Sequence, residues 1–285
     1  MTERRFYRFA GLDIAVEMPA EIMYRDERNL ASFRVESVSE PHRFTFDFVE
    51  ELPQPEGTII VRQPNFTVYA REGREIRYIG GHNAYLRAEH CGMEHMVQVE
   101  RRMYGGTIGT KTVLECIGVE HLTARNNGFL FHCSYIDYNG KAILFTAPSE
   151  TGKSTQAELW HRYRGAEIIN GDRAAVRLVD GRIRAEGIPF SGSSQYCKNR
   201  SLPVAAIVYL AQAPKTSIRK MRGYEAFSRI WEGISVNTWD RQDMEQVSSV
   251  VQKTAEQIPV YYLPCTPDES AVTALEEELK KLEQL

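Results

Sequence analysis

One stretch of the chain combines glycine, lysine and hydroxyl side chains at a spacing that could bind phosphate. The stretch is Ala147-Pro148-Ser149-Glu150-Thr151-Gly152-Lys153-Ser154-Thr155. It meets the pattern G-x-x-x-x-G-K-[ST] at every position except the first. In such a loop, backbone N–H groups and a helix N-terminus surround phosphate oxygens, the lysine reaches the β- and γ-phosphates, and the hydroxyl after it coordinates Mg²⁺. We predict that these residues bind ATP, with Lys153 on the phosphates and Ser154 as a Mg²⁺ ligand.

The segments on either side of this stretch fit a strand, a phosphate loop and a helix. Residues 142–146 are apolar, and a helical pattern runs over residues 156–163. Ala147 replaces the first glycine of the pattern, and Pro148 removes one amide donor. The alternative is an ordinary turn between a strand and a helix with a chance Gly-Lys-Ser. The flanking pattern favours the phosphate loop.

Two further residues could take part in phosphate chemistry. Asp172 follows the short apolar run Ile168-Ile169, where phosphate-loop proteins often place a carboxylate that holds Mg²⁺ or accepts a proton. The competing interpretation is a turn-capping aspartate. His132 lies within the strand-like residues 128–136. Its residue type alone favours a partly buried histidine without a catalytic role.

The composition is that of a globular protein. The chain has 285 residues, a formal net charge of -3 and a pI near 6.2, so it lacks the basic footprint of most nucleic-acid-binding proteins. No apolar run approaches the ~20 residues of a membrane span, and the N-terminus does not resemble a secretory signal. The five cysteines are far apart and include no C-x-x-C pair. We expect a cytoplasmic protein with reduced thiols, no nucleic-acid partner and no membrane partner; a homo-oligomer is compatible with the sequence.

The pattern of short elements predicts a mixed α/β fold with a mainly antiparallel β-rich domain over residues 1–104 and a phosphate-loop domain over residues 105–285. In the first half, Phe44, Phe46 and Phe48 alternate with polar residues, which places three rings on one face of a strand. Other strands are expected over residues 12–16, 58–61, 66–70, 76–79 and 96–99.

In the second half, apolar spacing predicts a helix over residues 110–122, and later helices over 224–234, 241–257 and 268–282. The pairs Asn139-Gly140 and Asp180-Gly181 predict hairpins. Gly165 predicts a helix end. Strands are expected over residues 203–210 and 258–263. The small residues of the segment 187–194 could approach a ligand closely or form a surface loop.

His90, Cys91 and His95 are residue types that bind zinc. A structural zinc site normally needs four such groups, and no second close pair accompanies them. We therefore do not predict a zinc site in this region.

The motifs together resemble the kinase domain of HPr kinase/phosphorylase, within the phosphoenolpyruvate carboxykinase-like phosphate-loop superfamily. The spacing of His132 ahead of Ala147 matches that family, and Asn170-Gly171-Asp172 falls where the family has an acidic pair, with Gly171 at the first acid and Asp172 at the second. The resemblance covers residues 128–285. It is closer to the HPr-kinase-like proteins associated with peptide modification, which share the segment Gly187-Ile188-Pro189-Phe190-Ser191-Gly192.

The resemblance implies an ATP-dependent kinase that transfers the γ-phosphoryl group to a hydroxyl, expected to be a serine or threonine of a peptide or small protein. It implies Asp172 as proton acceptor and Mg²⁺ ligand, His132 as a group that orients or protonates phosphate, and Lys153 as the phosphate-neutralising cation. The N-terminal half does not resemble the sensor domain of the bacterial HPr enzyme.

Two other functions are compatible with the sequence. The first is a nucleotide-gated regulatory protein that recruits a peptide along an exposed edge strand of the N-terminal sheet, without kinase activity. The second is a phosphoenolpyruvate carboxykinase, although the chain is short for that enzyme and shows no separate cluster of metal ligands and carboxylate-binding arginines.

Overall fold

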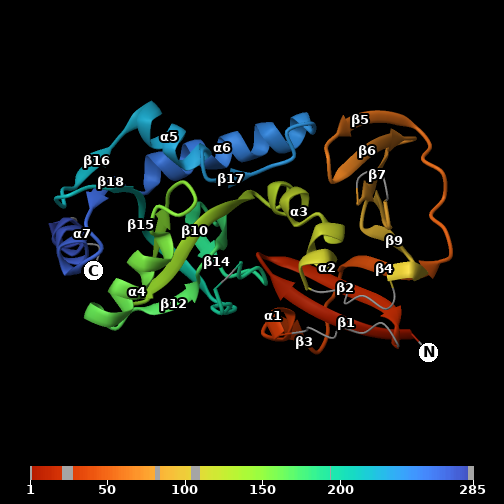
Figure 1. The fold of residues 1–285 in the computed structure, drawn as a ribbon, viewed down its shortest axis with the longest axis horizontal. Helices are drawn as coiled ribbons and strands as arrows, with labels where there is room; N and C mark the ends of the chain where they lie inside the picture. The colour runs from red at the N-terminus through yellow and green to blue at the C-terminus, as the bar shows by residue number, and fades with distance from the viewer. Residues whose placement is uncertain (1, 21–27, 81–83, 104–109, 193, 282–285) are drawn as a thin grey trace. The chain divides into compact units, whose positions relative to one another are not determined.

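The computed structural model describes residues 2–20, 28–80, 84–103, 110–192 and 194–281. The chain divides into two compact units, residues 1–119 and residues 120–285. The boundary expected between residues 104 and 105 lies outside the described residues. The chain contains two sheets together with helices, most of them in the second unit, so the fold is of the mixed α/β class (Figure 1). Among the described residues, no helix has both the length and the apolar character needed to cross a membrane.

The first unit is built on one sheet in the order β3-β1-β2-β4-β9-β8-β7-β6-β5. Most neighbouring strands are antiparallel, and the pairs β2–β4 and β4–β9 are parallel. The strands are β1 (Thr2–Phe9), β2 (Leu12–Pro19), β3 (Arg34–Val35), β4 (His42–Val49), β5 (Thr58–Arg62), β6 (Phe66–Arg71), β7 (Arg74–Ile79), β8 (Leu86–Cys91) and β9 (Glu94–Glu100). Each expected strand of this half is present.

The alternation predicted for β4 is confirmed. Phe44, Phe46 and Phe48 are buried, whereas Thr45 and Asp47 are exposed. Because successive side chains of a strand point to opposite faces, this strand buries three rings against the core of its unit and presents polar groups on the other face.

The prediction of one continuous helix over residues 110–122 is wrong. The structure has α2 (Thr110–Ile117) and α3 (Val119–Arg125) instead, after the short α1 (Arg28–Ala31) and the 3-10 turn η3 (Arg101–Met103). Gly118 separates α2 from α3 with φ of +65°, a left-handed conformation that glycine adopts without steric cost and that ends a helix. The apolar spacing continues across this break, so periodicity alone could not reveal it.

The second unit is built on a sheet in the order β11-β10-β13-β14-β15-β18-β16, in which β11 also pairs with β15. The strand β12 and the strand β17 each pair with β10. The strands are β10 (Gly128–Tyr138), β11 (Lys141–Thr146), β12 (Glu167–Asn170), β13 (Arg173–Val179), β14 (Arg182–Glu186), β15 (Ser201–Gln212), β16 (Arg219–Met221), β17 (Ile234–Ser235) and β18 (Val260–Cys265). The neighbours β11, β15 and β18 are parallel, so their carboxyl ends meet at one edge.

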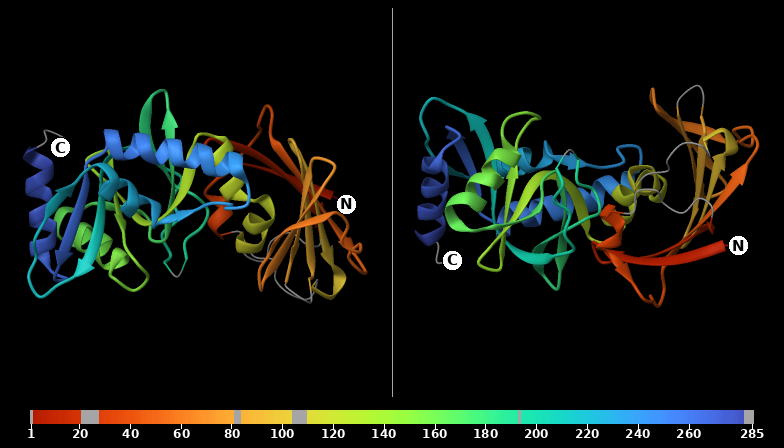
Figure 2. Two further views of the ribbon diagram at one scale, coloured as in Figure 1. Left: turned by 90° about the horizontal axis from the view of Figure 1, so that it is seen from above. Right: turned by 60° about the horizontal axis from the view of Figure 1, so that its bottom comes forward.

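Helices cover both faces of the parallel strands (Figures 1 and 2). One core packs α4 (Lys153–Arg164) and α7 (Glu269–Lys281) against the strands, and the other core packs α5 (Gly223–Trp231) and α6 (Arg241–Gln257). The two cores use alternate residues of β15: Ile207 and Tyr209 belong to one, whereas Val208 and Leu210 belong to the other. Strands buried on both faces are typical of parallel sheets.

Local signals in the second half predicted most of its elements. Both hairpin turns are present, with positive φ at Asn139 and Asp180, as the short hairpin loops require. The helix α4 ends at Gly165, whose amide donates to the carbonyl of His161 over 3.0 Å. The bounds expected for α6 are those observed, and the ends of α5 and α7 differ by a few residues.

Candidate functional site

The predicted phosphate loop joins the carboxyl end of β11 to the N-terminus of α4. The amide of Thr151 donates to the carbonyl of Pro148 over 3.4 Å, and φ is +64° at Glu150 and +119° at Gly152. Ala147 is not among the described residues with positive φ, so its backbone does not require the glycine of the standard pattern. Glu150 is exposed. The loop therefore keeps its turn without the first glycine.

The N-terminus of α4 carries backbone donors without a capping side chain. The first amides of an α-helix have no partner within the helix, and the helix dipole is positive at this end. Such an end binds anions readily. The remaining predicted loop residues, Ser149, Thr151 and Thr155, lie within or directly after the same turn.

Lys153 lies inside this loop and is 8% exposed. Its Nζ donates to the carbonyl oxygens of Ala147 and Pro148 over 3.0 and 3.2 Å. Burial lowers the pKa of Lys153, and the charge of Asp172 opposes that change. Both hydrogen-bond acceptors are neutral, so the ammonium lies where a phosphate could serve as its counterion.

Ser154 faces the turn between β12 and β13 that carries Asp172. Its hydroxyl donates to the carbonyl of Gly171 over 3.4 Å, and the hydroxyl of Ser134 donates to the same carbonyl over 3.2 Å. The hydroxyl of Ser154 and the carboxylate of Asp172 are oxygen ligands of the kind that Mg²⁺ prefers. The donor set therefore fits the predicted Mg²⁺.

The backbone of Asp172 is held on two sides. Its amide donates to Oδ1 of Asn170 over 2.9 Å, and its carbonyl accepts from the amide of Cys133 over 3.0 Å. Asn170 is fully buried and its side-chain amide also donates to the carbonyls of Ile188 and Phe190. One buried side chain thus fixes both the turn of Asp172 and the segment beside it.

The segment that contains Gly192 lies directly against the carboxyl of Asp172. A Cβ placed on Gly192 would be 2.6 Å from Cγ of Asp172, and φ at Gly192 is +54°. On the other side of the turn, a Cβ on Gly171 would be 2.5 Å from Cβ of Ser194. A second acid at Gly171 would therefore collide with Ser194.

We expect Gly192→Ala to lower phosphoryl transfer several-fold while leaving ATP affinity unchanged. The added methyl group must displace the carboxyl of Asp172, and misplacement of a reacting group lowers the rate more than it lowers binding. Gly181→Ala is a matched control, because φ at Gly181 is +77° but nothing lies within 4 Å of the added Cβ. Steady-state kinetics of both variants test this; equal rates would contradict it.

His132 pairs with Arg173 where β10 meets β13, so its side chain lies one residue from Asp172. Its Nε2 is 3.7 Å from Oδ1 of Asp172, and its side chain is 36% exposed. Burial and then the charge of Lys153 lower the pKa of His132 below its usual value, against the opposing effect of Asp172. A neutral imidazole beside the carboxylate follows at neutral pH.

The lowered pKa of His132 predicts a pH dependence of stability. The unfolded chain takes up this proton near pH 6.5, whereas the folded chain takes it up only at lower pH. The free energy of unfolding is therefore expected to fall as the pH drops from about 6.5 through the folded pKa. His132→Gln should flatten this fall. Urea unfolding of the protein and the variant at pH 7.5 and 5.5 measures it, and identical pH dependence of both would contradict the assignment.

Arg173 is a site residue that the sequence analysis did not single out. Its Nε is 3.4 Å from Oδ2 of Asp172, and its guanidinium carbon lies 5.4 Å from the centroid of the Phe190 ring. It also lies 3.9 Å from a carboxylate oxygen of Glu120. An arginine directly after the predicted base was the signal available in the sequence.

Two other groups of ionisable residues do not join this site. His121, Asp240 and Asp243 lie close enough to hold a metal ion, but the guanidinium of Arg125 donates to both carboxylates over 2.8 Å and takes the place of a cation. In the first unit, the rings of His90 and His95 approach to 3.1 Å between their Nδ1 atoms. Cys91 is exposed and, like the other four cysteines, is a free thiol.

Comparison with known proteins adds little to this geometry. No protein-family model matches the chain, and no curated protein matches it. Among solved structures, the chain is similar to that of the Hpr(Ser) kinase/phosphatase from Coxiella burnetii, with 11% sequence identity and a TM-score of 0.34 over 54% of this chain and 92% of that chain. A likeness at this level does not transfer a function, so the candidate site depends on its own residues.

Proposed function

We propose that this protein is an ATP-dependent kinase that transfers the γ-phosphoryl group to a serine or threonine hydroxyl of a peptide or small protein. The observation that carries the proposal is the convergence of Lys153, Ser154, Asp172 and His132 around one phosphate loop. These residues come from the start of α4, the turn before β13 and the middle of β10. Phosphoryl transfer depends mainly on positioning and charge stabilisation, which this arrangement can supply.

Each residue has a role that its position supports. Lys153 and the amides of the loop bind the β- and γ-phosphates. Ser154 and Asp172 would hold Mg²⁺, which supplies positive charge on the phosphate oxygens when bound. Asp172 accepts the proton of the acceptor hydroxyl as the new O–P bond forms and the bond to ADP breaks. His132 orients the phosphate or the carboxylate of Asp172.

The class of acceptor is consistent with the exposure of the site. The side chain of Asp172 is 28% exposed, which leaves the predicted base within reach of a hydroxyl carried on a larger molecule. A hydroxyl must come within hydrogen-bond distance of its base before the proton can move.

The direct test is incubation of the protein with γ-labelled ATP, Mg²⁺ and serine- or threonine-containing peptides, including those encoded beside its gene. We expect label on the peptide and a mass increase of one phosphate at a single hydroxyl residue. Binding of ATP without labelling of any acceptor would count against the kinase and favour the second candidate.

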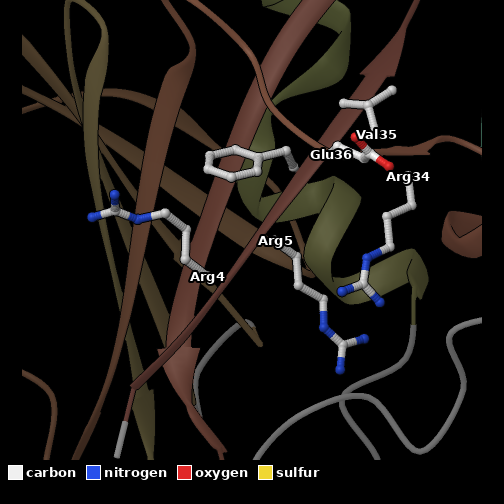
Figure 3. A pocket seen from close by; sticks show the side chains of 6 residues that line it. Arg4, Arg5, Arg34, Val35 and Glu36 are labelled. Carbon is white, nitrogen blue, oxygen red and sulfur yellow. The ribbon is translucent and has the colours of Figure 1, made fainter.

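A second candidate function is nucleotide-gated binding of a peptide without kinase activity. The first unit offers a specific feature for it: β3 pairs only with Phe6 and Tyr7 of β1, and no other described strand pairs with that edge of β1. A hollow of about 420 Å³ lies beside this edge, lined by Arg4, Arg5, Phe6, Arg34, Val35 and Glu36. Figure 3 shows the side chains of Arg5 and Arg34 extending in the same direction. An extended peptide could add a strand there.

A further inference from the structure

A cavity of about 520 Å³ opens beside the phosphate loop. Its walls are residues 212–214 at the carboxyl end of β15, Cys265 and Pro267 at the carboxyl end of β18, and Gly152 and Thr155 at the N-terminus of α4. These segments follow the carboxyl ends of parallel strands, where ligands of α/β sheets usually bind. The volume lies within the ~300–1,000 Å³ of most small-molecule pockets.

The phosphate loop has a different neighbour on each side. Ser154 donates to the carbonyl of Gly171, next to Asp172. Thr155 follows it by one residue, about 100° further round the helix, and lines the cavity. A triphosphate bound at this helix end therefore has the predicted base at one end and the cavity at the other.

The chemistry of the cavity suits an uncharged, flat group. None of its lining residues carries a formal charge, and Ala213, Pro214 and Pro267 supply apolar surface. Gln156 is 3% exposed and lines the same cavity. Its side-chain nitrogen donates to the sulfur of Cys265 over 3.3 Å, whereas its Oε1 has no hydrogen-bond partner among the described residues. A buried acceptor without a donor is costly, and rotation of the amide toward the cavity would let an N–H or O–H group of a ligand satisfy it.

We propose that this cavity holds the nucleoside of the triphosphate. This inference depends on the proposed function, since it assumes that the loop binds the phosphates. The nucleotide then crosses the N-terminus of α4 with its γ-phosphate toward Asp172 and its base against Ala213 and Pro214. The donor that Gln156 lacks comes from the base or the ribose, and the apolar wall covers one face of the ring.

Filling the cavity with a larger side chain distinguishes binding of the nucleoside from binding of the phosphates. In Ala213→Trp, we expect the Kd for a non-hydrolysable ATP analogue to rise about 10- to 100-fold, because the base loses its apolar contact surface. The Kd for inorganic tripolyphosphate, which has no nucleoside, should remain within about twofold of its starting value. Isothermal titration of the full chain measures both constants. Ala31→Trp, at an exposed position of α1 in the first unit, is the matched control.

Pro214→Trp provides a second test if Ala213→Trp does not fold, because Pro214 is exposed. Unchanged ATP affinity in a folded variant would overturn the nucleoside pocket and leave the kinase proposal intact. Equal weakening of ATP and tripolyphosphate would also overturn it, because the substitution would then act on the phosphate loop. If the unmodified protein binds neither ligand, the proposed function itself fails, and the pocket fails with it.

Discussion

Lys153→Ala is expected to lower kcat for phosphoryl transfer about 100- to 1,000-fold, the usual cost of removing one group that stabilises charge in the transition state. Lys153 is 8% exposed, and its ammonium donates to the carbonyls of Ala147 and Pro148, at the position where the loop would place phosphate. Alanine leaves the phosphate charge without a partner in a partly desolvated site. The affinity for ATP should fall as well.

Isothermal titration with a non-hydrolysable ATP analogue and a labelled-ATP assay together test this prediction. Lys253→Ala removes the same charge from an exposed position of α6 and should change neither quantity. Lys153→Arg provides a second comparison, because a planar guanidinium does not reproduce a compact ammonium inside a tight loop. Unchanged affinity together with unchanged turnover in Lys153→Ala would remove this residue from the site.

Asp172→Asn is expected to lower the rate of transfer about 100- to 10,000-fold, the range of a lost general base. Asparagine has nearly the same shape, and the two backbone bonds of this residue, to Asn170 and Cys133, do not involve its carboxylate. The variant should therefore fold and bind ATP, but it cannot accept the acceptor's proton. The assay uses saturating Mg²⁺, because the substitution also changes a proposed Mg²⁺ ligand.

The control for this variant is Asp180→Asn, in the exposed turn between β13 and β14. Asparagine tolerates the positive φ of that turn, so full activity is expected. A variant at Asp172 that transfers phosphate at the original rate would exclude this carboxylate as the base. If the unmodified protein labels no acceptor while it binds ATP, nucleotide-gated peptide binding becomes the better account.

The helices and strands that were predicted correctly are those whose signals lie within a few neighbouring residues of the sequence. The turn of Asn139-Gly140 positions β11 against β10, and the glycine at position 165 ends α4. The alternation of Phe44, Phe46 and Phe48 identified a strand with one buried face. Each of these signals involves only a few neighbouring residues, so it can be recognised without knowing how the rest of the chain folds.

The break between α2 and α3 at Gly118 could not be predicted from the local sequence pattern. Apolar residues keep helical spacing on both sides, and an isolated glycine inside such a pattern can be tolerated at a cost of about 1 kcal/mol. The parallel pairing of β11 with β15 could not be predicted from the sequence either, because those strands lie far apart in the chain. The pairing depends on the formation of both hydrophobic cores of the second unit.

The sequence by itself determined the phosphate-loop pattern, the candidates His132 and Asp172, and the short elements that carry them, because spacing and turn chemistry are local properties. Only the tertiary structure showed that the side chain of Asn170 ties the turn of Asp172 to the carbonyls of Ile188 and Phe190, that Gly192 packs against the carboxyl of Asp172, and that a cavity adjoins the loop. These features join segments remote in sequence. Their contacts arise from the packing of strand ends at one edge, which no local pattern encodes.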